Sequence, residues 1–332
     1  MATRNRRIVL ARRPRGVAEE ADFRLEEAEL PPVGEGKVLT RVRWLSLDPY
    51  MRGRMDDRKS YAAPQPLGEV MIGGTVEEVL ESRDPRFRPG DVVVGTSGWQ
   101  EYGLSDGAAL RKVDTSVVPA SAYLGCVGMP GVTAWYGLTR IGRPRPGETV
   151  LVSAAAGAVG SVVGQLARIL GCRAVGVAGG PAKCDHVVRD LGFDACVDHR
   201  ADGFRRDLAA AAPQGVDVLF ENVGGAVFDA ALARMNPAGR VAVCGLIAGY
   251  DGQEIPLRNV RAILTSRLLV QGFIVSEHLE LWPAALAELA GHVAAGRIRY
   301  RETVAVGLES APRAFLGMLR GENLGKQLVK VS

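Results

Sequence analysis

The sequence predicts an α/β protein with a doubly wound parallel sheet and a separate β-rich part. Three observations support this. From about residue 126, six short apolar runs alternate with segments of helical periodicity. A tight turn of small residues follows the first of these runs. Residues 1–125 instead show short strand patterns between loops dense in Gly and Pro. Alternating strands and helices are typical of a parallel sheet covered on both faces.

The expected elements divide the chain into two domains. Strands are expected over 6–10, 38–47, 73–81, 91–95, 101–104 and 110–113, and in the second part over 150–153, 173–177, 195–197, 216–221, 240–244 and 268–273. Helices are expected over 132–141, 159–170, 182–191, 203–211, 226–235, 257–266 and 282–295. A tail with a strand, a helix over 309–320 and a strand over 327–331 is expected to rejoin the first part. The predicted domains are therefore 1–125 with 300–332, and 126–299.

The turn between the first two elements of the second domain carries a small-x-Gly-x-x-Gly pattern. It runs from Ala155 to Gly160 and joins the expected strand to the expected helix. Small residues allow a pyrophosphate to approach the backbone, and the free N–H groups of the helix then hold the anion. A merely close-packed turn is the alternative, but the readable strand and helix on either side favour a dinucleotide site.

The end of the following strand indicates which dinucleotide binds. An NAD site usually places an Asp or Glu there for the ribose 2′-hydroxyl, whereas this chain has Gly179, Gly180 and then Lys183. The chain has 6 lysines against 35 arginines, so Lys183 stands out. A cation beside two glycines favours the 2′-phosphate of NADP over a solvated helix-start lysine. His199, after the third strand, is either a further contact or a surface histidine.

Composition and charge exclude several function classes. The net charge of +4 is too small and too evenly spread to indicate nucleic-acid binding, and we expect no membrane partner because no 18-residue apolar run exists. Five scattered cysteines without a CxxC indicate free thiols in a reducing compartment, and the cytoplasm is expected. The first 125 residues contain neither His nor Cys, so no catalytic zinc is expected.

The residues match a known family along nearly the whole chain. The matching stretches are Ser46–Met55, Gly128–Ala134, Val152–Gly164, Ala178–Gly180 with Lys183-Cys184, Phe220–Gly225, Gly239–Gly245, Gln271–Phe273 and Gly321–Lys326. With these motifs the chain resembles the zinc-free medium-chain dehydrogenase/reductases, in the group of prostaglandin reductase (leukotriene B4 12-hydroxydehydrogenase) and plant alkenal double-bond reductases.

This resemblance implies a GroES-like catalytic domain from both termini, a central Rossmann domain and a homodimer joined through the nucleotide domains. It implies NADPH-dependent reduction of the carbon–carbon double bond of small-molecule α,β-unsaturated ketones or aldehydes. By matching positions, cofactor contacts are implied at Ala156, Gly157, Val159, Gly160, Lys183, Asn222, Cys244, Tyr250 and Asn323, with Phe273 and Ile274 beside the nicotinamide. Substrate contacts are implied at Tyr50, Trp99 and Met129.

The group that stabilises the developing charge is open at this point. Where relatives have a tyrosine proposed to stabilise the enolate, this chain has Thr265. Candidate donors are a ribose hydroxyl, a backbone N–H and the phenol of Tyr50, which is alternatively a packed loop aromatic. Trp99 is either a core residue or a pocket wall. An NADPH:quinone oxidoreductase and a non-catalytic NADPH-binding sensor are the alternative functions.

Overall fold

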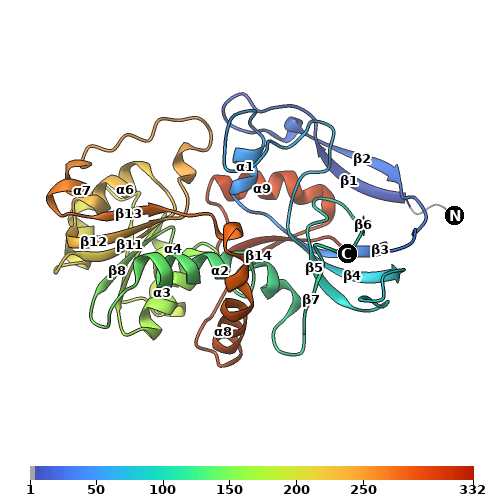
Figure 1. Ribbon diagram of the computed structural model, residues 1–332. Coiled ribbons are helices and arrows are strands. Elements are labelled where there is room, and N and C mark those ends of the chain that lie inside the picture. Colours follow the sequence, from blue (N-terminus) through green and yellow to red (C-terminus); the bar gives the residue numbers. More distant parts are fainter. Residues whose placement is uncertain (1–3) are drawn as a thin grey trace. The chain divides into compact units, whose positions relative to one another are not determined.

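The structure is a computed structural model that describes residues 4–332 and contains two compact units (Figure 1). Unit 1 comprises the described residues up to Leu124, with Glu302–Asn323 and Gln327–Ser332. Unit 2 comprises Gly125–Arg301 with Leu324–Lys326. Each unit is thus assembled from segments far apart in the sequence. Within residues 4–332, no helix has the length and apolar character needed to cross a bilayer.

Unit 2 is built on a six-stranded parallel sheet. Its strands are β8 Thr149–Ser153, β9 Arg173–Ala178, β10 Ala195–Asp198, β11 Val216–Glu221, β12 Met235–Val243 and β13 Leu269–Gly272. They lie in the order β10-β9-β8-β11-β12-β13. Counted from β8, this is the 3-2-1-4-5-6 order of the dinucleotide-binding Rossmann fold, in which the strand order reverses beside the first strand. The predicted doubly wound sheet is confirmed.

Helices cover both faces of this sheet. They are α2 Met129–Tyr136, α3 Gly160–Ile169, α4 Pro181–Asp185, α5 Phe204–Ala211, α6 Gly225–Leu232, α7 Arg261–Thr265 and α8 Trp282–Ala294. Two of them continue as π-helical turns, α2 over Gly137–Gly142 and α4 over His186–Asp190. Short 3₁₀ turns occupy Ile247–Gly249, Val275–Glu277 and Leu279–Leu281. Helices α5 and α6 share one apolar core with β8, β9 and β11, and Figure 1 shows α3 on the opposite face from α6.

Helix α3 shows why the sequence folds this way. Val162, Val163 and Leu166 recur at helical spacing, and all three are buried. Gly171 follows the helix with a φ of +77°, a conformation that glycine adopts without strain, and this ends the helix. The buried face packs α3 against β8 and β9.

Unit 1 contains a hairpin, a larger sheet and short helices. The hairpin pairs β1 Arg4–Leu10 with β2 Phe23–Glu29. The sheet has the order β14-β15-β3-β4-β5-β7, with β6 also pairing with β3. Its strands are β3 Val38–Ser46, β4 Thr75–Ser82, β5 Val92–Gly95, β6 Tyr102–Ser105, β7 Arg111–Lys112, β14 Glu302–Val306 and β15 Lys326–Lys330. The helices are α1 Tyr50–Arg54 and α9 Ala311–Leu319, with 3₁₀ turns at Glu20–Asp22, Ala120–Leu124 and Leu308–Ser310.

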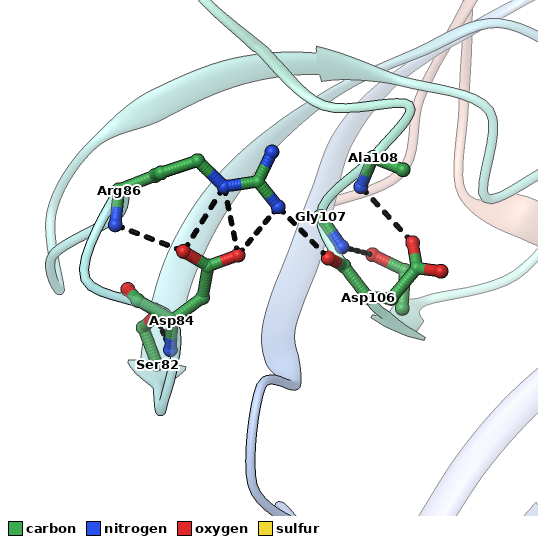
Figure 2. Close-up of polar contacts among 7 residues, drawn as sticks. Ser82, Asp84, Arg86, Asp106, Gly107 and Ala108 are labelled. Atoms are coloured by element: carbon green, nitrogen blue, oxygen red, sulfur yellow. Dashed lines mark hydrogen bonds and ion pairs between the residues drawn. The ribbon is translucent and has the colours of Figure 1, made fainter.

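The Arg86 guanidinium joins two turns at one end of the unit 1 sheet (Figure 2). Asp84 accepts hydrogen bonds from the backbone N–H of Arg86 at 2.9 Å and from its guanidinium at 2.6–3.1 Å. The same guanidinium donates to the carbonyl of Asp106 at 3.1 Å. The bonds from Arg86 hold the pKa of Asp84 below its usual range. The turn after β4 is thus tied to the turn after β6.

Candidate nucleotide-binding site

The glycine turn leaves β8 and enters α3 with almost no side-chain bulk. Ala155 and Ala156 are buried, and the N–H of Gly157 donates to the carbonyl of Ala154 at 2.9 Å. A Cβ added to Gly160 would lie 2.4 Å from the Ala154 carbonyl oxygen. The turn therefore closes only with small residues at these positions. It presents backbone N–H groups at the start of α3, as an anion site requires. Val159, another predicted contact, is the residue just before this helix.

Replacing Gly160 by alanine is expected to destabilise unit 2 by about 1–3 kcal/mol, because the new Cβ must displace the backbone of Ala154. Urea unfolding measures the change. Gly291→Ala in α8 is the matched control, since nothing lies within 4 Å of its added Cβ and alanine is the better helix former. Equal stability changes in the two variants would contradict the close packing at the turn.

A segment from the far end of the chain packs on this turn. The N–H of Gly325 donates to the carbonyl of Ala156 at 2.9 Å, and Gly325 forms a bridge with Gly157. Gly325 has a φ of +75°, and a Cβ there would lie 1.9 Å from the carbonyl oxygen of Arg301. The predicted contact Asn323 belongs to unit 1 and directly precedes this segment.

Two cationic side chains and a histidine gather where β9 and β10 end. A Cβ built on Gly179 would lie 2.9 Å from Nε of Arg200 and 3.0 Å from Nε2 of His199, so both side chains reach over this glycine. Lys183 is on α4, and its charge interacts with those of both residues. Partial burial and the charge of Arg200 lower the pKa of Lys183 and of His199. Such mutual repulsion is relieved by an anion, so the cluster suits a phosphate.

Arg200 was not predicted as a contact. The sequence places it directly after His199, and its role becomes visible only when β10 lies beside β9. The carboxylate of Asp198 organises this end of the sheet, because it accepts hydrogen bonds from the N–H groups of Gly180 at 2.8 Å and Arg200 at 2.9 Å. The sequence did contain a signal for this role, because Arg200 is a cation that follows the third strand and is adjacent to His199.

Asn222 is anchored to the end of β8. Its side-chain amide donates to the carbonyl of Ser153 at 2.7 Å, and its backbone N–H donates to the Ser153 hydroxyl at 2.7 Å. These bonds join the carboxyl ends of β8 and β11, where the strand order reverses. Ligands bind at this place in doubly wound sheets. The predicted contact is thus rigidly positioned at the expected rim.

Glu221, the last residue of β11, is a fully buried carboxyl group. Its Oε1 accepts hydrogen bonds from the N–H groups of Val223 at 2.5 Å and Gly224 at 2.7 Å. Its Oε2 is buried and has no hydrogen-bond partner among the described residues. Burial raises the pKa of Glu221 to about 7 in spite of these bonds. The neighbouring predicted contact, Cys244, has its pKa raised to about 12 by burial and by the Glu221 charge.

The aromatic residues at the same rim have different surroundings. Phe273, just after β13, packs its ring 5.4 Å from that of Tyr136 and edge-on to Phe220. Ile274 follows it and is half-buried. Tyr250 follows the 247–249 turn, and a Cβ built on Gly245 would lie 3.4 Å from its hydroxyl. The Phe273 ring is therefore held by tilted and edge-on aromatic contacts within unit 2.

The predicted substrate residues Tyr50 and Met129 belong to different units. Tyr50 begins α1 of unit 1, is half-buried and packs on the apolar core. Met129 begins α2 of unit 2, and its carbonyl accepts a hydrogen bond from Thr133 at 2.7 Å. Burial and the nearby Asp48 charge raise the pKa of Tyr50 above its ordinary value, so its hydroxyl keeps its proton.

Trp99 is packed in the core of unit 1. Its exposed fraction is 0%, and its ring stacks on Phe23 at 5.3 Å and meets Phe315 edge-on at 5.7 Å. These partners all belong to unit 1, so Trp99 is a core residue, and its contact with substrate stays a prediction. A strand-end aromatic fits a core residue and a pocket wall equally well in sequence.

Thr265 offers no replacement for the tyrosine of relatives. It lies on α7, is exposed, and its hydroxyl donates to the carbonyl of Arg261 one turn earlier at 3.2 Å. Within residues 4–332, no group of three or more His, Cys, Asp or Glu side chains is arranged to hold a metal ion.

Comparisons with known proteins agree with this geometry. Residues 6–113 match the family described as the N-terminal domain of oxidoreductase, and residues 158–291 match the zinc-binding dehydrogenase family. The NADPH-dependent curcumin reductase of Escherichia coli is 47% identical over 99% of this chain and 97% of its own. The 2-alkenal reductase (NADP(+)-dependent) of Nicotiana tabacum is 40% identical over 99% and 98%.

A solved structure extends the likeness to the fold. CurA from Vibrio vulnificus, in complex with NADPH, is 43% identical and superimposes with a TM-score of 0.94 over 98% of this chain and 99% of its own. These matches confirm the resemblance derived from the motifs and the GroES-like plus Rossmann fold class. The chain belongs to the medium-chain dehydrogenase/reductase family, in the group of the curcumin, 2-alkenal and prostaglandin reductases.

Proposed function

We propose that this protein is an NADPH-dependent reductase of the carbon–carbon double bond in α,β-unsaturated ketones and aldehydes. The observation that supports it best is the cluster of Lys183 with His199 and Arg200, the last two of which reach over Gly179, at the point where a dinucleotide's adenosine ribose lies in this fold. Membership of the family makes the chain an NADP-dependent oxidoreductase. The names of its relatives point to enal and enone substrates.

The residues present fit the cofactor. The turn from Ala156 to Gly160 would receive the pyrophosphate on backbone N–H groups, and the cation cluster would receive the 2′-phosphate. Asn222 and Cys244 at the rim would contact the ribose and the nicotinamide, and Phe273 and Ile274 would line the nicotinamide side. When bound, the reduced cofactor supplies a hydride for the β-carbon of the substrate.

Residues of this chain must then stabilise the negative charge that develops on the carbonyl oxygen of the substrate. A donor aimed at that oxygen lowers the barrier, because the charge forms only in the transition state. Tyr50 is our candidate donor, since burial keeps its hydroxyl protonated. The α-carbon then takes a proton, and the reaction is proposed to need no metal.

Lys183→Ala and Arg200→Ala are each expected to weaken NADPH binding about 10- to 100-fold while leaving NADH binding nearly unchanged. A charge-assisted hydrogen bond to phosphate contributes about 1.5–3 kcal/mol, and only NADPH has the 2′-phosphate. Calorimetric titration of both cofactors measures this. Arg189→Ala is the matched control, because this exposed arginine pairs with Asp185 outside the cluster. A parallel loss for NADPH and NADH would contradict the assignment.

The reaction itself is tested with a substrate panel and stereospecifically deuterated NADPH. We expect 3-nonen-2-one to be reduced with deuterium at the β-carbon, because the carbonyl group activates that position. Reduction of a 1,4-quinone alone would instead identify a quinone reductase. Tight NADPH binding without turnover of any compound would identify a sensor.

We also propose that the protein forms a homodimer through unit 2. Strand β13 lies at the edge of the parallel sheet and all its residues are exposed, including Leu269 and Val270. Leu264 nearby is 79% exposed. An apolar, unpaired strand edge favours pairing with a second copy. Light scattering of the wild type and of Val270→Lys measures the mass, and a monomeric wild type would reject the proposal.

All five cysteines are free thiols, which supports the predicted cytoplasmic location.

A further inference from the structure

Two thiols of unit 2 belong to elements that pack on one another. Cys184 is on α4, Cys196 is in β10 opposite Gly176 of β9, and α4 contacts β10. A Cβ built on Gly176 would lie 3.2 Å from Sγ of Cys196 and 3.0 Å from Cγ1 of Val187, which follows α4 in the chain. The Cys196 sulfur therefore lies on the sheet face that α4 and its continuation cover, and each thiol influences the pKa of the other.

We propose that Cys184 and Cys196 are a modification site: a peroxide converts them to a reversible disulfide, and this bridge weakens binding of the cofactor's 2′-phosphate. The second half of the proposal rests on the proposed function, because it assumes that Lys183, His199 and Arg200 hold that phosphate. None of the five cysteines forms a disulfide in the structure, so the described state is the reduced one.

The reaction balances with one peroxide and two thiols. One thiolate attacks a peroxide oxygen, the O–O bond breaks, and water leaves to give a sulfenic acid. The second sulfur attacks the first, the S–O bond breaks, and a second water leaves as the S–S bond forms. The sulfurs lose two electrons and the peroxide oxygens gain them. Burial raises the pKa of both thiols, so the reaction is slow and needs sustained oxidant.

The position of the pair connects it to the cation cluster. Lys183 directly precedes Cys184 on the five-residue helix α4, and His199 and Arg200 follow β10, which holds Cys196. A disulfide needs an S–S distance of about 2 Å, and the two sulfurs are not bonded in the structure. Closing the bond draws α4 toward β10, and Lys183 moves relative to His199 and Arg200.

The test uses the full chain treated with hydrogen peroxide and digested without reductant. We expect mass spectrometry to find a peptide pair joining residues 184 and 196, which dithiothreitol separates. We expect NADPH affinity to fall about tenfold on oxidation, NADH affinity to stay unchanged, and reduction to restore the original ratio. Circular dichroism before and after treatment verifies that the fold persists.

Single variants distinguish the effect of oxidising this pair from the effect of oxidation elsewhere in the chain. Cys184→Ser and Cys196→Ser each remove the bridge and the oxidant effect. Cys172→Ser keeps both, because the Cys172 thiol donates instead to the carbonyl of Arg145 at 3.2 Å. A peptide map without the 184–196 link, or a bridge that leaves the NADPH-to-NADH affinity ratio unchanged, overturns the inference. Equal affinities in the reduced protein would instead reject the proposed function, and the peptide map would still decide whether the bridge forms.

Discussion

Replacing Tyr50 by phenylalanine is expected to lower kcat for an enone about 10²- to 10³-fold, because it removes the hydroxyl proposed to donate to the developing enolate oxygen. The substitution keeps the ring, and the ring is the part that packs on the core of unit 1. The KM for NADPH should be unchanged, since Tyr50 is not assigned to the cofactor. Steady-state kinetics with 3-nonen-2-one measures both constants.

A purely structural role for Tyr50 predicts a different pattern. It would lower the melting temperature and leave kcat nearly unchanged in the folded fraction. Tyr102→Phe is the matched control, because Tyr102 is also in unit 1, half-buried, and its ring lies under the guanidinium of Arg41. If Tyr50→Phe and Tyr102→Phe turn over the enone equally well, Tyr50 is excluded as the donor.

The stability of the protein is expected to depend on pH through Glu221. Its pKa is raised to about 7 in the folded state, whereas an unfolded glutamate titrates near 4.5. The folded state therefore holds the proton more tightly, and stability from this group is fully present below about pH 4.5 and lost as pH rises through about 7. The difference corresponds to on the order of 3 kcal/mol.

Glu221→Gln isolates this contribution. Glutamine mimics the protonated acid, so it retains an acceptor for the N–H groups of Val223 and Gly224 and carries no charge. Relative to wild type, the variant should gain stability between about pH 5 and about pH 8, measured by urea unfolding at each pH. Glu254→Gln, at an exposed position in the same unit, should show no such trend. A constant difference across this range would refute the raised pKa.

The sequence predicted the nucleotide-binding unit well because its signals are local. The strand over 216–221 was predicted with both its bounds, and the helix at 160–169 to within a residue at each end. Strand β2, Phe23–Glu29, was missed because mostly charged residues cover one side of a hairpin and leave no apolar run. Helix α1 was missed between the expected strands over 38–47 and 73–81, since five residues show no periodicity.

The candidate site was predicted only in part, for a physical reason. The glycine turn and Lys183 follow from backbone requirements and charge, which a sequence displays. Arg200 joins the cluster through strand pairing, and the raised pKa of Glu221 comes from complete burial at a strand end. Burial also decided that Trp99 belongs to the core. A short stretch of residues shows neither which strands will pair nor how deeply a side chain will be buried.

The bond between Gly325 and Ala156 has a consequence for synthesis on the ribosome. The strands and helices over 149–294 emerge early and already contain the residues of the six-stranded sheet. Their glycine turn, the proposed pyrophosphate site, still lacks its covering segment until residues 324–326 are translated, because these residues bond to Ala156 and Arg301. Gain of dinucleotide affinity during translation should therefore lag behind formation of the sheet, so the nascent chain acquires its cofactor late.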